Sequence, residues 1–247
     1  LLCGVSSFGI DWFCENIVPK IPESLPVLSI TKGMIALEDG SMLSSPEVME
    51  ERAAALGKKN IDFNAVGGPC TSYELADLDP TEVTFCGTDM EVLRMIKSAM
   101  ATDYYHISLS RDVIGVESAV ALKNGYALGI ALTIGLNQKA FGIDSELHYN
   151  SQAAVFGQAV REMDKLLTLQ GADHFNSRVV GYGDLYVTVY GGRTRLVGIL
   201  LGRGLNIDEA KAELQGVTLE SLVVAERVAR AVKKKAERGE IKIGEYP

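Results

Sequence analysis

The sequence predicts a chain of the α/β plus all-α class, in which a mostly parallel sheet precedes an all-helical region. Up to about Ser110, short apolar strand-like runs alternate with helix-like segments, and this alternation is typical of a parallel sheet. After Asp112 the pattern becomes helical, and no later run is typical of a strand. We therefore expect two domains, at residues 1–110 and 111–247.

Five strands and three helices are expected in the first part. Apolar runs predict a strand and turn within residues 1–9, and further strands at residues 27–31, 60–66, 82–86 and 104–109. Ser45-Pro46-Glu47 combines a helix cap with Pro at the first helical position, so it predicts a helix that ends before Gly57. The other two helices are expected at residues 11–18 and 90–100.

The second part is expected to contain six helices, at residues 112–136, 147–170, 176–190, 194–203, 208–214 and 218–238. The first begins at a plausible N-cap, Asp112, and is almost wholly apolar. A membrane span needs about 20 consecutive apolar residues. Because Glu117 and Lys123 interrupt this run, the pattern favours the central core helix of a globular protein.

The composition favours a reduced, cytoplasmic protein. The 247 residues carry a net charge of −8, so nucleic acid is not an expected partner. Four cysteines form no Cys-x-x-Cys pair and have no ligand spacing with the three histidines, so no metal site is expected. The sequence has no signal peptide or lipidation motif, and no membrane partner is expected. The first residues resemble the interior of a strand, so we expect further sequence before Leu1.

Lys123 is the first candidate functional residue, because lysine is almost never fully buried without a partner. A lone lysine in an apolar helix usually extends its charged end to solvent. Here Asn124 follows directly, and a carboxylate motif lies downstream, so we favour a functional lysine. In that motif Asp184 and Thr188 stand four residues apart and would share one helix face. By itself, this motif would more often be an ordinary aspartate near a helix N-terminus, favoured by the helix dipole.

Anion-binding features occur at strand ends and at one helix start. Lys32-Gly33 and Gly68-Pro69-Cys70 follow predicted strands, where open α/β sheets bind ligands, although most such glycines only form turns. Gly191-Gly192 ends one predicted helix, and Arg193 and Thr194 begin the next. Free backbone N–H groups beside a guanidinium would suit a phosphate. A solvated loop arginine is the alternative interpretation.

The sequence contains no strand followed by G-x-G-x-x-G and a helix, the usual dinucleotide-binding pattern. Gly181-Tyr182-Gly183 has part of that spacing but lies within the predicted helical part.

Taken together, these segments resemble the NAD(P)-dependent glycerol-3-phosphate dehydrogenase family. The matching segments are Lys32-Gly33, GGPCTSYE (67–74), SRDVIGVESAVALKN (110–124), residues 150–163, GYGDLYVT (181–188) and GGRTRLVG (191–198). The succession of ALKN, GDL-x-x-T and GGR is specific, and the resemblance spans essentially the whole chain. The sequence departs from the family pattern at Cys70 (usually Ser), Gln152 (usually Lys), Thr194 (Asn) and Gln215 (Glu).

The resemblance implies a Rossmann-type sheet whose first strand, glycine loop and helix precede Leu1, and a helical domain like the C-terminal one of 6-phosphogluconate dehydrogenase. It implies NAD- or NADP-dependent reduction of dihydroxyacetone phosphate to sn-glycerol 3-phosphate. Lys123 would transfer the proton and pair with Asp184, which would limit the fall of the lysine pKa on burial. Substrate oxygens would contact Lys32, Asn124 and Thr188. The substrate site would include Gly68, Cys70, Gly192, Arg193 and Thr194, and cofactor contacts would come from Lys32, Ser72, Arg193 and Gln215.

Two alternatives remain open at this stage. Lysine-dependent 2-ketoacid or ketopantoate reductases also carry a helical C-terminal domain, but they lack the GDL-x-x-T and GGR segments. A catalytically inactive helical dimerisation module is the second, because a fold alone does not guarantee activity. The large helical part makes a homodimer the expected assembly.

Overall fold

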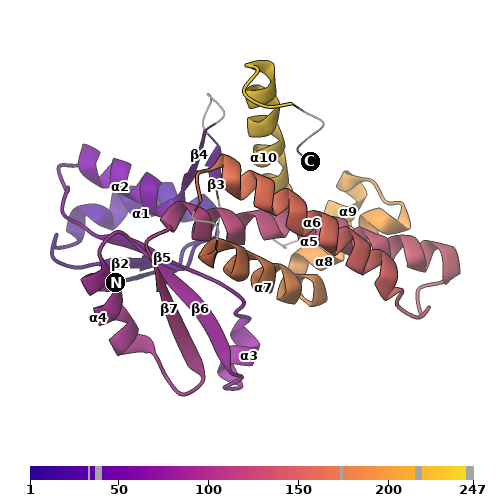
Figure 1. The fold of residues 1–247 in the computed structure, drawn as a ribbon, viewed down its shortest axis with the longest axis horizontal. Coiled ribbons are helices and arrows are strands. Elements are labelled where there is room, and N and C mark those ends of the chain that lie inside the picture. Colours follow the sequence, from indigo (N-terminus) through magenta and orange to yellow (C-terminus); the bar gives the residue numbers. More distant parts are fainter. Residues whose placement is uncertain (33, 37–40, 173–174, 215–218, 243–247) are drawn as a thin grey trace.

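The computed structural model describes residues 1–32, 34–36, 41–172, 175–214 and 219–242. A sheet with its covering helices forms one end of the molecule, and a group of helices around one long helix forms the other (Figure 1). The class expected from the sequence is therefore confirmed.

The main sheet has five strands in the order β1-β2-β5-β6-β7. They are β1 (Leu2–Cys3), β2 (Val27–Ser29), β5 (Phe63–Gly67), β6 (Thr81–Cys86) and β7 (Tyr105–Ser110). Every neighbouring pair is parallel except β5 and β6, which are antiparallel. Antiparallel neighbours need no crossover helix, and the segment between β5 and β6 contains only the short helix α3 (Ser72–Ala76), which was not predicted.

Helices cover both faces of this sheet. Val27 and Phe63 pack with helices α1 (Ile10–Asn16) and α2 (Ser45–Ala55), whereas Leu28 and Val66 pack with α4 (Met90–Met100) on the other face. Two short 3-10 turns, at Ser7–Gly9 and Val18–Lys20, flank α1. The cap of α2 is Ser44 rather than the expected Ser45, and its hydroxyl and the Glu47 carboxylate form a reciprocal capping box.

A second, two-stranded sheet was not predicted. Its strands β3 (Met34–Ala36) and β4 (Met42–Ser44) pair antiparallel, directly after Lys32-Gly33 in the sequence. Met34 and Met42 are buried in a core cluster made mainly by the C-terminal helices. Three-residue strands carry almost no periodic signal, so the sequence did not indicate this hairpin, which contacts distant in sequence help to stabilise.

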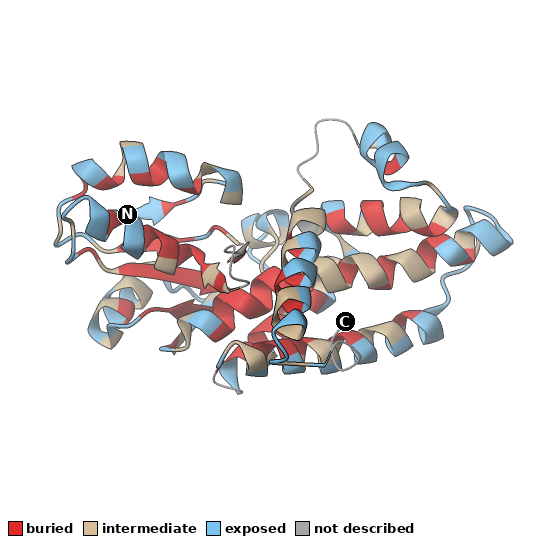
Figure 2. Ribbon diagram, turned by 90° about the horizontal axis from the view of Figure 1, so that it is seen from above, coloured by how far each residue is buried: buried red, intermediate tan, exposed pale blue. Residues whose placement is uncertain are grey.

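The helical part is organised around α5 (Val113–Phe141), which runs five residues beyond its predicted end. It is accompanied by α6 (Tyr149–Leu169), α7 (Asn176–Tyr190), α8 (Gly192–Arg203), α9 (Ile207–Glu213) and α10 (Glu220–Glu237). Among the described residues, α5 alone is long and apolar enough to span a membrane, and 56% of its most apolar window is buried within the protein. That burial is typical of a core helix, in agreement with the expectation. Figure 2 shows buried residues concentrated where the sheet and the inner helices meet.

Helices α5 and α8 approach each other closely enough for their backbones to touch. A Cβ atom at Gly198 would lie 2.4 Å from the carbonyl oxygen of Leu128, and one at Gly202 would lie 2.2 Å from that of Leu132. Small residues therefore set the spacing of the two helices. The contact holds α8 against α5 along its length, and the first turn of α8 lies beside the middle of α5.

Candidate active site

The candidate site lies where the sheet meets α5. Val116 and Val120 in the first half of α5 pack against Ala65 of β5. This contact brings the middle of α5, with Lys123 and Asn124, beside the carboxyl ends of β2 and β5. Since β2 and β5 are parallel, Lys32 and Gly68, which follow them, emerge at the same edge of the sheet.

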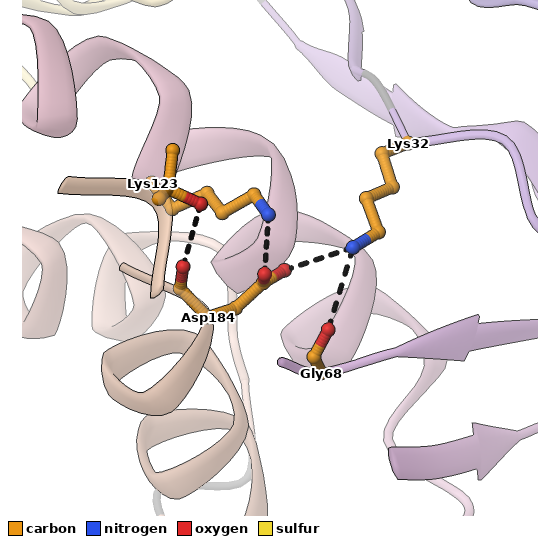
Figure 3. A network of polar contacts seen from close by, with 5 residues as sticks. Lys32, Gly68, Lys123 and Asp184 are labelled. Atoms are coloured by element: carbon orange, nitrogen blue, oxygen red, sulfur yellow. Dashed lines mark hydrogen bonds and ion pairs between the residues drawn. The ribbon is translucent and has the colours of Figure 1, made fainter. Parts of the chain in front are cut away.

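Two lysines share one buried carboxylate at this edge. The Lys123 ammonium forms an ion pair with Oδ1 of Asp184, as expected from the sequence. Lys32 Nζ lies 3.1 Å from the other oxygen, Oδ2, and 3.4 Å from the carbonyl oxygen of Gly68. Figure 3 shows both ammonium groups directed at Asp184, from α5 and from the segment after β2. The pairing of Lys32 with Asp184 was not predicted.

Burial strengthens the interactions between the charges of Lys123, Lys32 and Asp184. Asp184 is 1% exposed and Lys123 is 7% exposed, whereas the Lys32 side chain is 26% exposed. Burial lowers the pKa of Lys123 to about 8; the Asp184 carboxylate opposes this fall, and the nearby Lys32 charge adds to it. Lys123 can therefore gain and lose a proton near neutral pH, which agrees with the pKa direction expected from the sequence.

Thr188 lies one helical turn after Asp184 on α7. Its hydroxyl donates to the backbone carbonyl oxygen of Asp184 at 2.7 Å. The oxygen atom can still accept a hydrogen bond from a ligand. The side-chain amide of Asn124 makes no hydrogen bond to any described residue, so both its donor and its acceptor are free.

These side chains line a cavity of about 350 Å³. Its walls come from α5, from α7, from the segment after β5 and from the first turn of α8. The sequence-derived site residues in its lining are Cys70, Ser72, Lys123, Asn124, Asp184, Thr188, Gly192, Arg193 and Thr194. Lys32 and Gly68 lie alongside through their contacts with Asp184 and with each other. Gln215 lies outside the described residues.

The first turn of α8 forms one wall of the cavity. The helix begins at Gly192, two residues before the predicted start, and the positive φ of +84° at Gly192 favours glycine. Arg193 is exposed and makes no ion pair with the described residues, while Thr194 is 8% exposed and its hydroxyl has no described partner. Backbone N–H groups in the first turn of a helix also lack intrahelical acceptors. The wall therefore offers several free donors to an anion.

The opposite side of the cavity carries uncharged groups. Burial raises the pKa of the Cys70 thiol, and the nearby Lys32 partly offsets this rise. The thiol therefore stays protonated at neutral pH and acts as a small, weak donor. Ser72 is exposed at the start of α3, and Tyr73 beside it, which the sequence did not identify as a site residue, also lines the cavity.

Like Tyr73, Glu117 was not identified as a functional candidate from the sequence. Its side chain is fully buried in α5, and neither carboxylate oxygen has a hydrogen-bond partner among the described residues. Burial raises its pKa to about 8, and the charge of Lys32 partly opposes this rise. An acidic residue in an otherwise apolar helix, six positions before Lys123, was the available signal.

No group of three or more His, Cys, Asp or Glu side chains that could hold a metal ion occurs among the described residues.

The chain was compared with known protein families, and residues 112–245 match the family model for the NAD-dependent glycerol-3-phosphate dehydrogenase C-terminus. The chain belongs to this family. The match covers α5 to α10 and includes the Lys123, Asp184 and Arg193 positions of the cavity.

Relatives and solved structures extend the similarity to the sheet. The chain is 33% identical over 216 residues to an NADP(+)-dependent glycerol-3-phosphate dehydrogenase of Archaeoglobus fulgidus, covering 87% of this chain and 62% of the relative. It is 30% identical to a glycerol-3-phosphate dehydrogenase [NAD(P)+] of Koribacter versatilis, covering 84% and 58%. The chain thus spans about three fifths of the length of these relatives.

A crystal structure of glycerol-3-phosphate dehydrogenase from Coxiella burnetii superposes with a TM-score of 0.79 at 23% identity, over 95% of this chain and 67% of that one. At this identity the comparison establishes the shared fold, including both the sheet and the helical part.

Proposed function

We propose that this chain carries the substrate site and the acid–base lysine of an NAD(P)-dependent glycerol-3-phosphate dehydrogenase. The reaction would be the reversible reduction of dihydroxyacetone phosphate to sn-glycerol 3-phosphate. The observation that carries the proposal is the buried Lys123–Asp184 ion pair, which lines the same cavity as the free donors of Arg193 and Thr194. Family membership and the names of the relatives point to the same activity.

The free donors beside the cavity fit the phosphate-bearing parts of NAD or NADP. Arg193 has no described ion-pair partner, and Ser72 is exposed nearby, so both can contact a dinucleotide without breaking an existing interaction. Lys32 would contribute from the sheet edge, and we retain Gln215 as a fourth contact from the sequence. A bound reduced nicotinamide would supply the hydride. The protein would supply orientation and a proton.

Lys123 would hold that proton next to the substrate carbonyl oxygen. General acids and bases work best when their pKa lies near the working pH, and the pKa of Lys123 is lowered to about 8. In the direction of reduction, the Lys123 ammonium donates its proton to the oxygen that becomes the new hydroxyl. In the reverse direction the neutral amine removes it. Asp184 keeps the ammonium aimed and prevents its pKa from falling further.

Three neighbours would orient the substrate oxygens. The ammonium of Lys32 and the amide of Asn124 can donate to oxygens that gain negative charge during reduction. The Thr188 hydroxyl already donates to its own helix, so its oxygen would accept from a substrate hydroxyl. These positive and polar groups lie in a mostly buried site, where electrostatic stabilisation is stronger than in water.

The phosphate would lie against the first turn of α8. Arg193 offers a planar, permanently charged donor, and the backbone N–H groups near Gly192 and Thr194 offer fixed ones. Cys70 and Gly68 would contribute to the substrate site from the opposite side. Since Cys70 and Thr194 differ from the usual family residues, these two positions would adjust how tightly the phosphate and the carbon chain are held.

We also propose that residues 1–110 are the remainder of a dinucleotide-binding domain and residues 111–247 the substrate-binding domain. A homodimer is proposed as the assembly, and the exposed apolar residues Phe175, just before α7, and Val179 and Tyr186 on α7 offer a surface for it. Sedimentation velocity would test this assembly. A cytoplasmic location is proposed with it, because all four cysteines are free thiols.

Substrate-dependent oxidation of NADH and NADPH tests the proposed function. The protein should oxidise either cofactor with dihydroxyacetone phosphate. Its turnover should be much slower with unphosphorylated dihydroxyacetone. Faster turnover of 2-ketoacids or ketopantoate would instead favour the related lysine-dependent reductases. Absence of turnover with every substrate, in a folded protein that binds cofactor, would favour an inactive dimerisation module.

A further inference from the structure

The β3–β4 hairpin connects the two parts of the molecule. It follows Lys32 in the sequence, yet Met34 and Met42 are buried among residues of α5 and α10, including Leu122, Val224 and Val228. In Figure 1 α10 rises next to this hairpin, and α10 and β3 are in contact. The position of the backbone after Lys32 is thus set by a helix that lies almost 200 residues later.

One polar contact joins α10 to this backbone. Arg227 on α10 donates from Nη1 to the backbone carbonyl oxygen of Met34 at 2.7 Å. The Arg227 side chain is half-buried and forms no ion pair with the described residues. Among the described residues this guanidinium holds a backbone carbonyl and no carboxylate, so it acts as a specific anchor for that segment of chain.

Lys32 lies between this anchor and a second one. On the other side, the Thr31 hydroxyl donates to the carbonyl oxygen of Val5 at 2.7 Å, and Thr31 is buried against the sheet. Lys32 therefore reaches Asp184 from a short segment that is fastened at one end to the sheet and at the other to α10. These two anchors therefore determine where Lys32 lies.

We propose that Arg227 is a positioning residue for the active site, which holds Lys32 against Asp184 by anchoring the backbone carbonyl of Met34. The inference rests on the proposed function only for its kinetic consequence. Its structural consequence is that loss of the Arg227 anchor lets the charge of Lys32 move away from the Lys123–Asp184 pair.

The pKa of Lys123 reports whether Lys32 lies close to Asp184. The titratable and charged groups that face Lys123 are Asp184 from α7, Lys32 from the segment after β2, and the Cys70 thiol after β5. Asp184 raises the lysine pKa and Lys32 lowers it. If the hairpin loosens, Lys32 moves away and Asp184 pairs with Lys123 alone. The pKa of Lys123 must then rise, whereas a merely structural loss on α10 would leave it unchanged.

The test compares Arg227→Met with Arg230→Met. Arg230 lies on the same helix but is exposed and, among the described residues, pairs with Glu226 alone, so its variant controls for the loss of one arginine from α10. The pKa of Lys123 is measured by trace acetic anhydride labelling across pH, with mass spectrometry of the labelled peptide. We expect Arg227→Met to raise this pKa by at least ~0.5 unit, since a like charge has moved away. Arg230→Met should leave it unchanged.

Kinetics give the second measurement. In the catalytically competent protein, Arg227→Met should lower kcat for dihydroxyacetone phosphate by at least ~5-fold, because a misplaced contact group weakens orientation in the transition state. Arg227→Lys, which keeps a cationic donor, should restore most of the loss. Where Met is not tolerated, Arg227→Gln, whose amide is too short to reach Met34, takes its place.

A folded Arg227 variant in which the pKa of Lys123 and kcat both stay at the wild-type values would overturn the inference. The labelling experiment needs no turnover. A protein that fails to reduce dihydroxyacetone phosphate but shows the pKa rise would therefore refute the proposed function and leave the role of Arg227 standing.

Discussion

The buried carboxyl of Glu117 gives the chain a pH-dependent stability that one substitution should remove. Glu117 is fully buried in α5, and its pKa is raised to about 8 from an ordinary value of 4.5. The charged groups that face it are Lys32 and Glu47, and the neighbouring Cys86 thiol is uncharged. Glu117→Gln keeps the size and shape of the side chain but cannot ionise, so it isolates the effect of the charge.

The direction follows from proton binding. Between pH 4.5 and about 8 the folded protein keeps the Glu117 proton, whereas the unfolded chain releases it. Folding therefore takes up a proton in this range, and the stability that Glu117 contributes is full below pH 4.5 and is lost as pH rises. One pKa unit corresponds to about 1.4 kcal/mol, so a shift from 4.5 to about 8 amounts to on the order of 5 kcal/mol.

Urea unfolding at several pH values measures this loss. The unfolding free energy of Glu117→Gln relative to the wild type should increase by about 4 kcal/mol between pH 5 and pH 8.5, most of the total set by the pKa shift. Any fixed cost of burying the amide cancels in this comparison. Glu51→Gln, on the exposed surface of α2, is the matched control and should show no such trend. A pH-independent difference for Glu117→Gln would mean that Glu117 is already ionised in the folded protein.

Three further substitutions test the phosphate contact and the helix packing. Arg193→Ala should weaken the use of dihydroxyacetone phosphate by at least ~2 kcal/mol in kcat/KM, in the range for charge-assisted hydrogen bonds, while unphosphorylated dihydroxyacetone hardly changes. Equal losses for both substrates would show that Arg193 does not bind the phosphate. Gly135→Ala should destabilise the fold by about 1–3 kcal/mol, because the new Cβ would lie 2.1 Å from the carbonyl oxygen of Ile199. At Gly129, on the same helix, a new Cβ would have no atom within 4 Å, so Gly129→Ala should stabilise the fold by about 0.5–1 kcal/mol. Urea unfolding measures both effects, and equal changes in the two variants would contradict this reasoning.

The sequence predicted the elements whose signal is local. Helix α5 was predicted because apolar residues dominate a long stretch that begins at a capping aspartate, and Asp112 does accept from the Gly115 N–H. Helix α2 was predicted from its Ser-Pro-Glu start, although the cap proved to be one residue earlier. In both cases the information lies within a few residues of the boundary.

The sequence failed where the structure depends on distant contacts. The β3–β4 hairpin is stabilised by burial of Met34 against α10, and nothing near Met34 in the sequence indicates this. The antiparallel pairing of β5 with β6 was missed for a related reason, because the expected alternation of strands and helices does not fix the direction of a single strand. Short strands and reversed neighbours are decided by packing.

The candidate site was predicted by two routes of different strength. Lys123 was identified because a buried lysine requires a partner, and its ion pair with Asp184 confirms this expectation. The other residues gained their proposed roles from the family resemblance, and the cavity gathers most of them. Neither route anticipated that Lys32 also pairs with Asp184, because that contact depends on how the sheet and α7 pack together.

The central claim is that Lys123 transfers the proton, and Lys123→Met tests it most directly. Methionine keeps the unbranched stem in the apolar helix and removes the ammonium, while Lys32 still neutralises Asp184 at 3.1 Å. The variant should therefore fold, with an ordinary circular dichroism spectrum and melting transition.

The decisive measurement is kcat of Lys123→Met with dihydroxyacetone phosphate in the catalytically competent protein. We predict a loss of at least ~10²-fold, since general acid–base groups contribute about 10²- to 10⁴-fold. The change in KM should be smaller, because the proton is needed mainly in the transition state. Near-normal kcat in a folded Lys123→Met protein would contradict the account and transfer the acid–base role to Lys32.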